Sequence, residues 1–212
     1  EWGDLQIVFA TTQGDVRRNR LSDFTNVRSN GKIAMKLPEG VELVNARICS
    51  EDDDVMLTTN SGRAIRFAST DLRVMNSRAS TGVRGIRLTG DDMVVSMSVI
   101  RHFEATPEER AAYLKMRRAL AGVTDEEAVE DDVPADPNFS QERYEEMAAV
   151  ENLILTITRG GSGKLSSSHD YPVRGRGGMG VAAMDKAMRG GPVVASFPVE
   201  LVDQIMLVTS TG

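Results

Sequence analysis

The sequence predicts an all-β fold of repeated four-stranded antiparallel blades, interrupted once by a helical insertion. Three observations predict this fold. A pattern of about 48 residues recurs along the chain, apolar residues alternate with polar residues between glycine turns, and one segment has helix signals instead. Four strands in about 48 residues is the size of a propeller-type blade.

Each repeat begins with an apolar strand and a polar turn that ends in glycine. The repeats start at Leu5, Asp54 and Asn152, and the segment DQIMLVTSTG at 203–212 closes the chain with the same pattern. Alternating apolar residues and a glycine turn are typical of a β-hairpin. The turn glycines are Gly14, Gly62, Gly163 and Gly212.

The second half of each repeat has a recognisable order. A basic second strand is followed by an aspartate with a large apolar residue, then by an arginine three or four residues before a glycine, and then by a third and a fourth strand. The pairs are Asp23-Phe24, Asp71-Leu72 and Asp170-Tyr171, then Arg28/Gly31, Arg78/Gly82 and Arg176/Gly180. We expect the aspartate to cap a turn and the apolar residue to anchor the core. Tyr171 is therefore a structural residue and not a nucleophile, since Phe24 and Leu72 share its place.

The insertion covers residues 102–149 and predicts two helices. Thr106 is an N-cap, Pro107 takes the first helical position and Glu109 completes a capping box, so a helix should run to about Gly122. An acidic, proline-containing loop follows, and Ser140 caps a shorter second helix. The chain thus divides into two blades at 1–101, the insertion at 102–149, and a third blade with the start of a fourth at 150–212.

Composition excludes several classes of protein. The chain has 212 residues, of which 41% are hydrophobic, and no apolar run approaches the roughly 18 residues of a membrane helix. Cys49 is the only cysteine, so no intramolecular disulfide forms, and a single thiol is compatible with a reducing cytoplasm. The residues show no zinc-type spacing, acid pair or catalytic triad. The first residue is not methionine, and we expect the chain to be a piece of a longer protein.

The glycine-rich stretch RGGSGKLSSSHDYPVRGRGGMGV, residues 159–181, raises the question of phosphate binding. It is not a P-loop, because Thr158 stands where the first glycine belongs and Leu165 where the magnesium-binding serine or threonine belongs. The pattern Gly175-x-Gly177-x-x-Gly180 fits a dinucleotide fingerprint, but the residues after it are too few for a crossover helix before Gly190. The stretch is better explained by the backbone of a nucleic acid.

Basic residues gather in the same part of each repeat. Residues 14–36, 62–88 and 159–189 hold six bases each, whereas residues 101–150 hold 13 acids and 6 bases and account for the net charge of −6. Recurrence on successive blades predicts a continuous positive rim that suits a bent polyanion. The predicted DNA-binding residues are Arg17, Arg18, Arg20, Arg28, Lys32, Arg63, Arg66, Arg73, Arg78, Arg84, Lys164, Arg174 and Arg176.

Aromatic residues bear on which form of nucleic acid is bound. Only 5% of the residues are aromatic, and single-strand binding needs exposed aromatics on which bases stack. The pattern therefore favours contacts to the phosphates of a duplex, with little readout of sequence. We interpret the insertion as a surface excursion between blades. The alternative is an acidic brake that competes with DNA for the basic rim.

The repeats resemble the family of C-terminal domains found in the A subunit of DNA gyrase. The most specific matches are DDVMLTTNSGRAIRF at 53–67 and STGVRGIRLTGDDMVVS at 80–96, supported by GKIAMKLPEG at 31–40 and DQIMLVT at 203–209. The resemblance covers the chain except about 102–149. The family's Gln-Arg-Arg-Gly-Gly-Lys-Gly box is not present as such; RGRGGMG at 174–180 is similar to it but lies in a later repeat.

This resemblance implies a β-pinwheel, a disc of blades with swapped strands that wraps duplex DNA around its outer edge. It implies that the whole enzyme, an ATP-hydrolysing type II topoisomerase with Mg²⁺, introduces negative supercoils as an A2B2 complex with the gyrase B protein in the bacterial cytoplasm, at the nucleoid. The cleavage tyrosine and the ATPase lie outside this chain, which binds no cofactor of its own. A full pinwheel has about six blades, so these repeats make only part of a disc. The alternatives are the corresponding domain of topoisomerase IV and a propeller-like scaffold that binds a protein.

Overall fold

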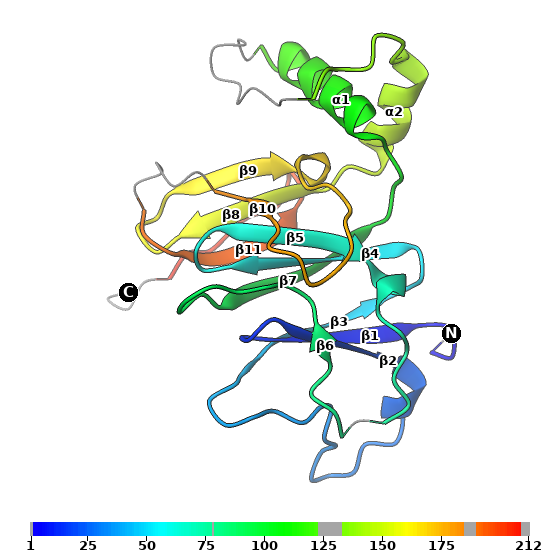
Figure 1. Cartoon of the computed structure of the whole chain (residues 1–212), viewed down its shortest axis with the longest axis vertical. Coiled ribbons are helices and arrows are strands. Elements are labelled where there is room, and N and C mark those ends of the chain that lie inside the picture. The colour runs from blue at the N-terminus through cyan, green and yellow to red at the C-terminus, as the bar shows by residue number, and fades with distance from the viewer. Residues whose placement is uncertain (1, 78, 123–132, 185–189, 209–212) are drawn as a thin grey trace.

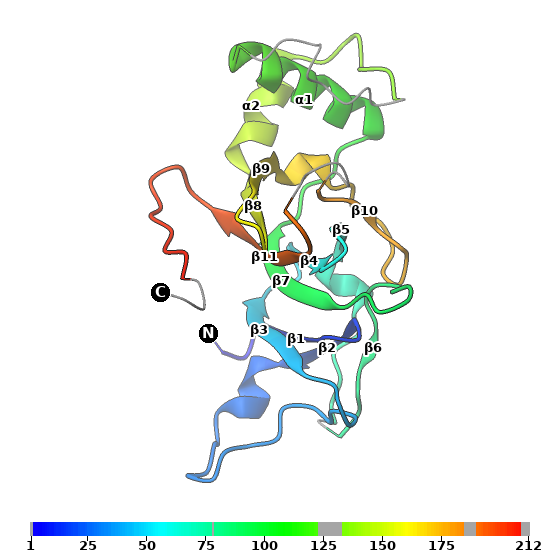
Figure 2. The same ribbon diagram turned by 90° about the vertical axis from the view of Figure 1, so that its left-hand side faces the viewer.

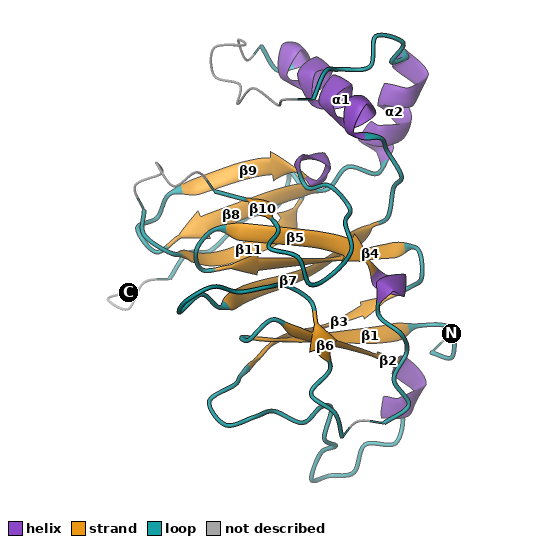
Figure 3. Cartoon of the chain, viewed as in Figure 1, coloured by secondary structure: helices purple, strands orange, loops and turns teal. Residues whose placement is uncertain are grey.

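The three blades stack along the long axis of the molecule, with the helices at one end (Figure 1). The structure is a computed structural model, and it describes residues 2–77, 79–122, 133–184 and 190–208. The strands of neighbouring blades lie roughly parallel to one another across the view, as the orange arrows of Figure 3 show. Within the described residues, no helix is long and apolar enough to cross a bilayer.

Blade 1 is a four-stranded sheet in the order β3-β1-β2-β6. A hairpin joins β1 (Gln6–Thr11) to β2 (Asp15–Arg20), and β3 (Leu43–Cys49) pairs antiparallel with the other edge of β1. The short 3₁₀ helix η1 (Leu21–Phe24) follows β2. The fourth strand, β6 (Val83–Arg84), comes from the second repeat and pairs with β2.

Blade 2 repeats this arrangement in the order β10-β5-β4-β7. Its own strands are β4 (Asp53–Thr59), β5 (Arg63–Ala68) and β7 (Val94–Arg101), and the 3₁₀ helix η2 (Ser69–Asp71) follows β5. Its fourth strand, β10 (Val181–Ala182), comes from the third repeat and pairs with β5. The all-β fold with exchanged strands is confirmed.

Blade 3 contains β11 (Val193–Val199), β8 (Leu153–Thr158) and β9 (Gly163–Ser167), followed by the 3₁₀ helix η4 (Ser168–Asp170). Among the described residues this sheet has three strands, in the order β11-β8-β9. Residues 203–208, predicted to begin a fourth blade, lie outside any strand, and 209–212 lie outside the described residues. The turn glycine of this blade is Gly161 rather than Gly163, because the Gly161 amide bonds the Thr158 carbonyl as Gly62 bonds Thr59.

The third strand of repeats 2 and 3 is shorter than its sequence suggests and does not complete its own blade. β6 and β10 have two residues each, and each adds to the sheet of the preceding blade. Figure 2 shows them at the right of the molecule, whereas β3 and β11 lie toward the left. In repeat 1 the described residues 32–36 form no strand.

The core lies between the blades and not within one of them. Val8 and Val16 of blade 1 pack with Val55, Leu57 and Phe67 of blade 2, and all five side chains are fully or almost fully buried. A second cluster joins blades 2 and 3 and consists of Met56, Ala64, Ile100, Ile154, Tyr171 and Ala183. Each sheet is therefore buried by its neighbour. The strands β3, β7 and β11, which we call the inner strands, form the sheet edges opposite β6, β10 and β9, and β7 packs against both β3 and β11.

Two of the three predicted anchors fill these interfaces. Leu72 and Tyr171 are 1% and 2% exposed, and both belong to the clusters between blades. Phe24 is half-buried and packs its ring against Phe9 at a centroid distance of 5.7 Å. The Asp170 carboxylate accepts a hydrogen bond from the Ser167 amide, as expected of a turn cap. The assignment of Tyr171 as a structural residue is thus confirmed.

The insertion forms the helices α1 (Pro107–Leu120) and α2 (Gln141–Ala149). The predicted capping box is present, since the Glu109 amide donates to the Thr106 hydroxyl and the Thr106 amide to the Glu109 carboxylate. The Arg143 amide donates to the predicted Ser140 cap. Part of the acidic loop, residues 123–132, lies outside the described residues. A small core of Tyr113, Leu114 and Met147 holds the two helices together.

Candidate nucleic-acid interface

Two loops form the outer edge of the blades, and we call them the rim loops. The first, residues 73–82, runs from η2 of blade 2 to β6 at the edge of blade 1, and the second, residues 172–180, runs from η4 of blade 3 to β10 at the edge of blade 2. The Gly177 amide bonds the Gly85 carbonyl at 2.6 Å, and the Arg87 amide bonds the Gly178 carbonyl at 2.8 Å. The outer edges of blades 1 and 2 are thus joined along the rim.

Glycine is required where each rim loop crosses the preceding blade. Gly82 has φ of +100°, and a Cβ there would lie 2.4 Å from the Val16 carbonyl oxygen. Gly180 has φ of +69°, and its Cβ would lie 2.2 Å from the Ala64 carbonyl oxygen. Left-handed backbone and close approach to a carbonyl both exclude other side chains. These glycines serve the close approach of one blade to the next.

Six of the predicted DNA-binding residues are exposed to solvent at their described positions. They lie on the rim loops, on the adjoining β6, at the end of β2 and in the loop after η1, and they are Arg20, Arg28, Arg73, Arg84, Arg174 and Arg176. Arg87, which follows β6, is also exposed. Their exposure is compatible with the predicted phosphate contacts, which stay a prediction.

Arg176 connects the rim loops. Its Nη1 donates to the Arg84 carbonyl at 3.0 Å and its Nε to the Asp71 carbonyl at 3.2 Å. The side chain therefore spans the junction between blades 1 and 2 while remaining exposed. It positions the main chain of Arg84 as well as adding its own charge to the rim.

Three of the predicted DNA-binding residues are wrong, because their side chains are buried. Arg17, Arg18 and Arg66 are 0%, 2% and 3% exposed. Arg17 donates to the Asn19 side chain and the Ser80 carbonyl, and Arg18 and Arg66 donate to carbonyls of the following blade. A buried guanidinium with protein acceptors cannot reach a phosphate. Charge alone predicts a surface position for these residues, but the packing of one blade on the next encloses Arg18 and Arg66. Arg17 points to the other face of its sheet, where it contacts the first rim loop at Ser80.

The remaining predicted residues are half-buried or not described. The Arg63 guanidinium donates to the carbonyls of Met179 and Gly180, so it holds the second rim loop. Lys32 donates to the Asp23 carbonyl, and Lys164 is half-buried on β9. Arg78 lies outside the described residues.

One acid lies beneath the exposed bases. Asp15 pairs with Arg84 across the β2–β6 ladder. Burial raises the pKa of the Asp15 carboxyl, and the positive charge of Arg84 opposes that shift. The net charge at this point of the rim therefore depends on both the exposed Arg84 and the half-buried Asp15.

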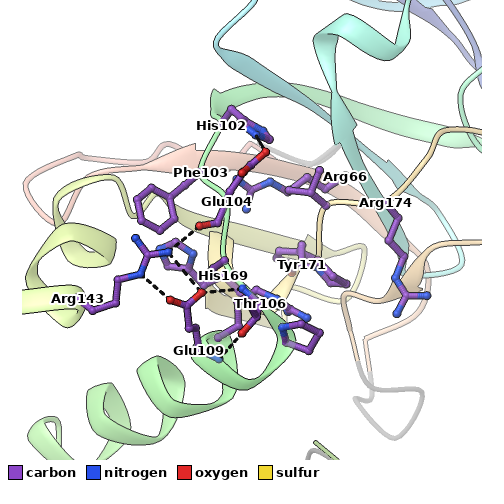
Figure 4. A pocket seen from close by; sticks show the side chains of 15 residues that line it. Arg66, His102, Phe103, Glu104, Thr106, Glu109, Arg143, His169, Tyr171 and Arg174 are labelled. Carbon is purple, nitrogen blue, oxygen red and sulfur yellow. Dashed lines mark hydrogen bonds and ion pairs between the residues drawn. The ribbon is translucent and has the colours of Figure 1, made fainter. Parts of the chain in front are cut away.

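A groove of about 900 Å³ separates the insertion from the second rim loop (Figure 4). Its insertion side carries an ion pair of Arg143 with Glu109 at 2.8 Å, and the Arg143 guanidinium lies 4.7 Å from the centre of the Phe103 ring. Its blade side carries His169, whose burial lowers the pKa of the imidazole. His169 bonds the Met147 carbonyl and stacks edge-on against Tyr113, so it joins α1 and α2 to η4.

Acidic and basic side chains of the groove are engaged with one another. Glu109 and Arg143 are paired with one another, and no cluster of described His, Cys, Asp or Glu side chains could hold a metal ion. The dinucleotide hypothesis is also excluded by geometry, because the strand β10, and not a helix, begins directly after Gly180.

Sequence reasoning missed the partners of the buried arginines. Asp54 is fully buried and accepts hydrogen bonds from Arg66 Nε and His102 Nδ1, both at 2.7 Å. A signal was available, since Asp54 directly precedes the apolar residues Val55, Met56 and Leu57 of a predicted strand, where an unpaired carboxylate would be costly. That aspartate predicts a buried cation on the neighbouring strand.

The family model for the "DNA gyrase C-terminal domain, beta-propeller" matches three segments of the chain. They are residues 6–50, 53–101 and 152–198. Each segment corresponds to one repeat, and the insertion falls between the second and the third. The matched segments together cover more than half of the chain.

The curated relatives are DNA gyrase A subunits. The chain is 49% identical to the DNA gyrase A protein of Granulibacter bethesdensis, with 100% of this chain and 24% of that protein covered. It is 44% identical to the corresponding protein of Rickettsia bellii, with 100% and 23% covered, and 31% identical to that of Salmonella typhimurium, with 98% and 18% covered. The chain spans about a quarter of the length of the first two relatives.

Solved structures share the fold at low sequence identity. The C-terminal domain of DNA topoisomerase IV superposes with a TM-score of 0.63 at 15% identity, covering 93% of this chain and 47% of that chain. The E. coli ParC C-terminal domain superposes with a TM-score of 0.56 at 16% identity, covering 93% of this chain and 63% of that one. These likenesses concern the fold alone.

Proposed function

Because this chain belongs to the family of DNA gyrase A C-terminal domains, we propose that it binds duplex DNA along its rim loops and bends it around the blades. The observation that carries the proposal is the row of exposed arginines on the outer edge of successive blades. Arg84 lies at the edge of blade 1, and Arg174 and Arg176 lie on the loop that reaches the edge of blade 2.

The composition of this surface supports contact with phosphates rather than bases. The cationic groups are arginines on the rim loops and on the two-residue strand β6, and the described aromatic rings lie mainly in the blade interfaces and the insertion. Contacts to phosphate fix the path of a duplex without reading its sequence. We therefore propose binding that is nonspecific in sequence. The identities of 49% and 44% favour gyrase over topoisomerase IV.

We extend the proposal to the whole protein. It would be the gyrase A protein of a bacterial type II topoisomerase that acts with the gyrase B protein as an A2B2 complex and uses ATP and Mg²⁺ to introduce negative supercoils. It would work in the cytoplasm, at the nucleoid. This chain would contribute the bending of DNA and none of the chemistry of strand cleavage.

The test is the dependence of duplex binding on salt in the full-length protein. Arg73, Arg84 and Arg174 are changed together to alanine, because all three are exposed at the rim. Each phosphate contact contributes about −0.9 to the slope of log K against log salt, so the slope should become shallower by up to about 2.7. Affinity should fall by a similar factor for duplexes of unrelated sequence.

The matched control changes two exposed bases that lie away from the rim. Arg47 is on the inner strand β3 and Lys115 is on α1. Their replacement by alanine should leave the slope within error of the parent. A slope that the rim variant does not alter, with an unchanged melting curve, would place the DNA elsewhere. Binding of an acidic protein in place of duplex DNA would support the scaffold alternative.

A further inference from the structure

The same arginine occurs at the same place in blades 1 and 2, and we call Arg18 and Arg66 the joint arginines. Each stands four residues after its turn glycine, Gly14 or Gly62. Each forms a parallel bridge to the following blade, Arg18 with Val74 and Arg66 with Val173. The joint arginines therefore lie where the chain of the next blade begins its rim loop.

The side chain of each joint arginine holds the 3₁₀ turn of the following blade. Arg18 Nη1 donates to the Ser69 carbonyl at 2.7 Å, and Arg66 Nη1 donates to the Ser168 carbonyl at 2.8 Å. Ser69 and Ser168 are the first residues of η2 and η4. One guanidinium nitrogen thus makes the same contact in both joints.

The main chain of each joint arginine holds the start of the rim loop. The Arg18 carbonyl accepts from the Met75 amide at 2.8 Å, and the Arg66 carbonyl accepts from the Arg174 amide at 2.9 Å. Side chain and main chain together fix residues 69–75 against blade 1 and residues 168–174 against blade 2. The direction in which each rim loop leaves its blade is determined by these two contacts.

The remaining donors differ between the two joints. Arg18 Nη2 donates to the Gln6 side chain and to Glu51, whose carboxylate is 72% exposed. Arg66 Nε is paired with the fully buried Asp54, and its Nη2 donates to the Arg101 carbonyl at 3.0 Å. Figure 4 shows that Arg66 and His102, which both bond Asp54, lie close together in the lining of the groove.

Blade 3 carries no joint arginine. Leu165 stands four residues after its turn glycine Gly161, and this leucine is 47% exposed. The arginine is thus confined, among the described blades, to the two whose outer edge is completed by a rim loop from the next blade.

From these contacts we infer that the joint arginines set the angle between neighbouring blades, and thereby the curvature of the rim along which DNA is bent. This inference rests on the proposed function for its second half only. The planar guanidinium binds several acceptors in one fixed geometry, which a flexible ammonium group cannot do. Arg18 and Arg66 are positioning residues, since they act on DNA through the rim loops and do not touch it.

Two variants of the full-length protein test the inference. Arg18→Met leaves no buried charge behind, because Glu51 is exposed, and Asp54→Asn with Arg66→Met removes both members of the buried pair. Two dyes on Gln13→Cys and Thr70→Cys report the angle between blades 1 and 2 without DNA; both positions are exposed and Cys49 is buried. A broader distribution of dye distances is expected for Arg18→Met, with Arg18→Lys intermediate.

DNA bending is measured on the same proteins with an end-labelled duplex of about 30 base pairs at saturation, a length over which bending has a measurable elastic cost. Both joint variants should bend it less, whereas affinity for a duplex of about 12 base pairs, too short to follow the curve, should stay within about twofold. Arg84→Ala is the matched control: it should weaken binding of the short duplex and leave the dye distances unchanged. Cooperative melting is recorded for every variant.

Three outcomes would overturn the inference. They are unchanged dye distances in Arg18→Met, unchanged bending in both joint variants, or loss of cooperative melting in Arg18→Met, which would assign the residue to global stability. Failure of the parent protein to bind any duplex would remove the proposed function. In that case the dye distances, which require no DNA, would still decide whether the arginine sets the blade angle.

Discussion

The joint between blades 1 and 2 and the joint between blades 2 and 3 repeat one set of contacts but balance their central charge differently. Both contain an arginine whose side chain bonds a 3₁₀ turn and a two-residue exchanged strand. Both also contain a glycine, Gly82 or Gly180, that packs closely against a carbonyl oxygen of the preceding blade. In the first joint the acid partner Glu51 is in solvent, and in the second joint Asp54 is fully buried. The contacts of the arginine with the next blade are thus the same in both joints, whereas the acid that balances its charge differs.

The second joint is also tied to the insertion through several hydrogen bonds. His102, at the start of the insertion, bonds Asp54, and His169 of η4 bonds the Met147 carbonyl of α2. Arg110 of α1 donates to the His169 carbonyl at 3.2 Å. Perturbations of the second joint should therefore cost more and respond to pH, which the following variants examine.

The largest difference between the joints is expected when each arginine is replaced singly. Arg66→Met leaves the Asp54 carboxylate buried without its guanidinium and should lower the free energy of unfolding by about 3–5 kcal/mol. Arg18→Met leaves buried carbonyl groups and the solvent-exposed Glu51 carboxylate without this donor, and it should cost about 1–3 kcal/mol. Denaturant unfolding of both variants measures the difference. Equal losses would contradict the assigned role of Asp54.

Replacement of the glycine where each rim loop crosses the preceding blade should destabilise both joints equally. Gly82→Ala and Gly180→Ala each place a methyl group within 2.4 Å of a carbonyl oxygen at positive φ, and each should cost about 2–4 kcal/mol. Gly31→Ala is the control, because φ is +82° there but no atom lies within 4 Å of the added carbon. It should cost about 1 kcal/mol from backbone strain alone. A cost at Gly31 equal to that at Gly82 would show that contact is unimportant.

Acid should weaken the second joint in particular. Burial lowers the pKa of His169 below the ordinary value of 6.5, with nearby Arg66 and Arg110 acting in the same direction and Glu151 and the Met147 carbonyl opposing. The unfolded chain then binds a proton that the folded chain resists, so stability should be full above pH 6.5 and decline as the pH falls below it. His169→Gln, with a side-chain amide that can donate to Met147, should flatten this decline. An identical pH profile in that variant would point to another group.

The smallest effect is expected within the insertion. Arg143→Ala removes an ion pair with Glu109 and a contact with the Phe103 ring, and Arg143 is 29% exposed. Partly exposed pairs of this kind contribute about 1 kcal/mol or less. Thermal melting should shift slightly, and the dye distance across the first joint should not change. A large loss would show that the insertion supports the blades through this ion pair.

Much of the fold could be predicted from sequence because the repeat carries local signals. The hairpins and the Thr106 capping box depend on neighbours a few residues away. The anchors Leu72 and Tyr171 could be predicted because they recur at the same place of the repeat. The exchange of β6 and β10 between blades could not be derived from periodicity, since a two-residue strand has no pattern of its own. It was expected only from the family resemblance.

The candidate site was predicted less well, because a count of bases does not reveal which of them face solvent. Arg17 and Arg18 follow each other on β2 and point to opposite faces of the sheet, yet both are buried. In a sheet covered on both faces, neither position of the strand is a surface. Arg84 and Arg174, which lie on the short outer strand and the rim loop, were assigned to the rim by the same count and are exposed.

The exchanged strands also have a consequence for a chain that emerges from the ribosome. β4, β5 and β7 of blade 2 are complete at Arg101, but β10, which closes that sheet, follows about 80 residues later. At 5–20 residues per second the edge of β5 stays open for roughly 4–16 seconds of synthesis, most of it spent on the insertion. An unpaired strand edge is a template for mispairing, and charged side chains on such an edge oppose it. β5 carries Arg63 and Arg66, so the arginines that later fasten the blades together also protect the open edge while the partner strand is still being made.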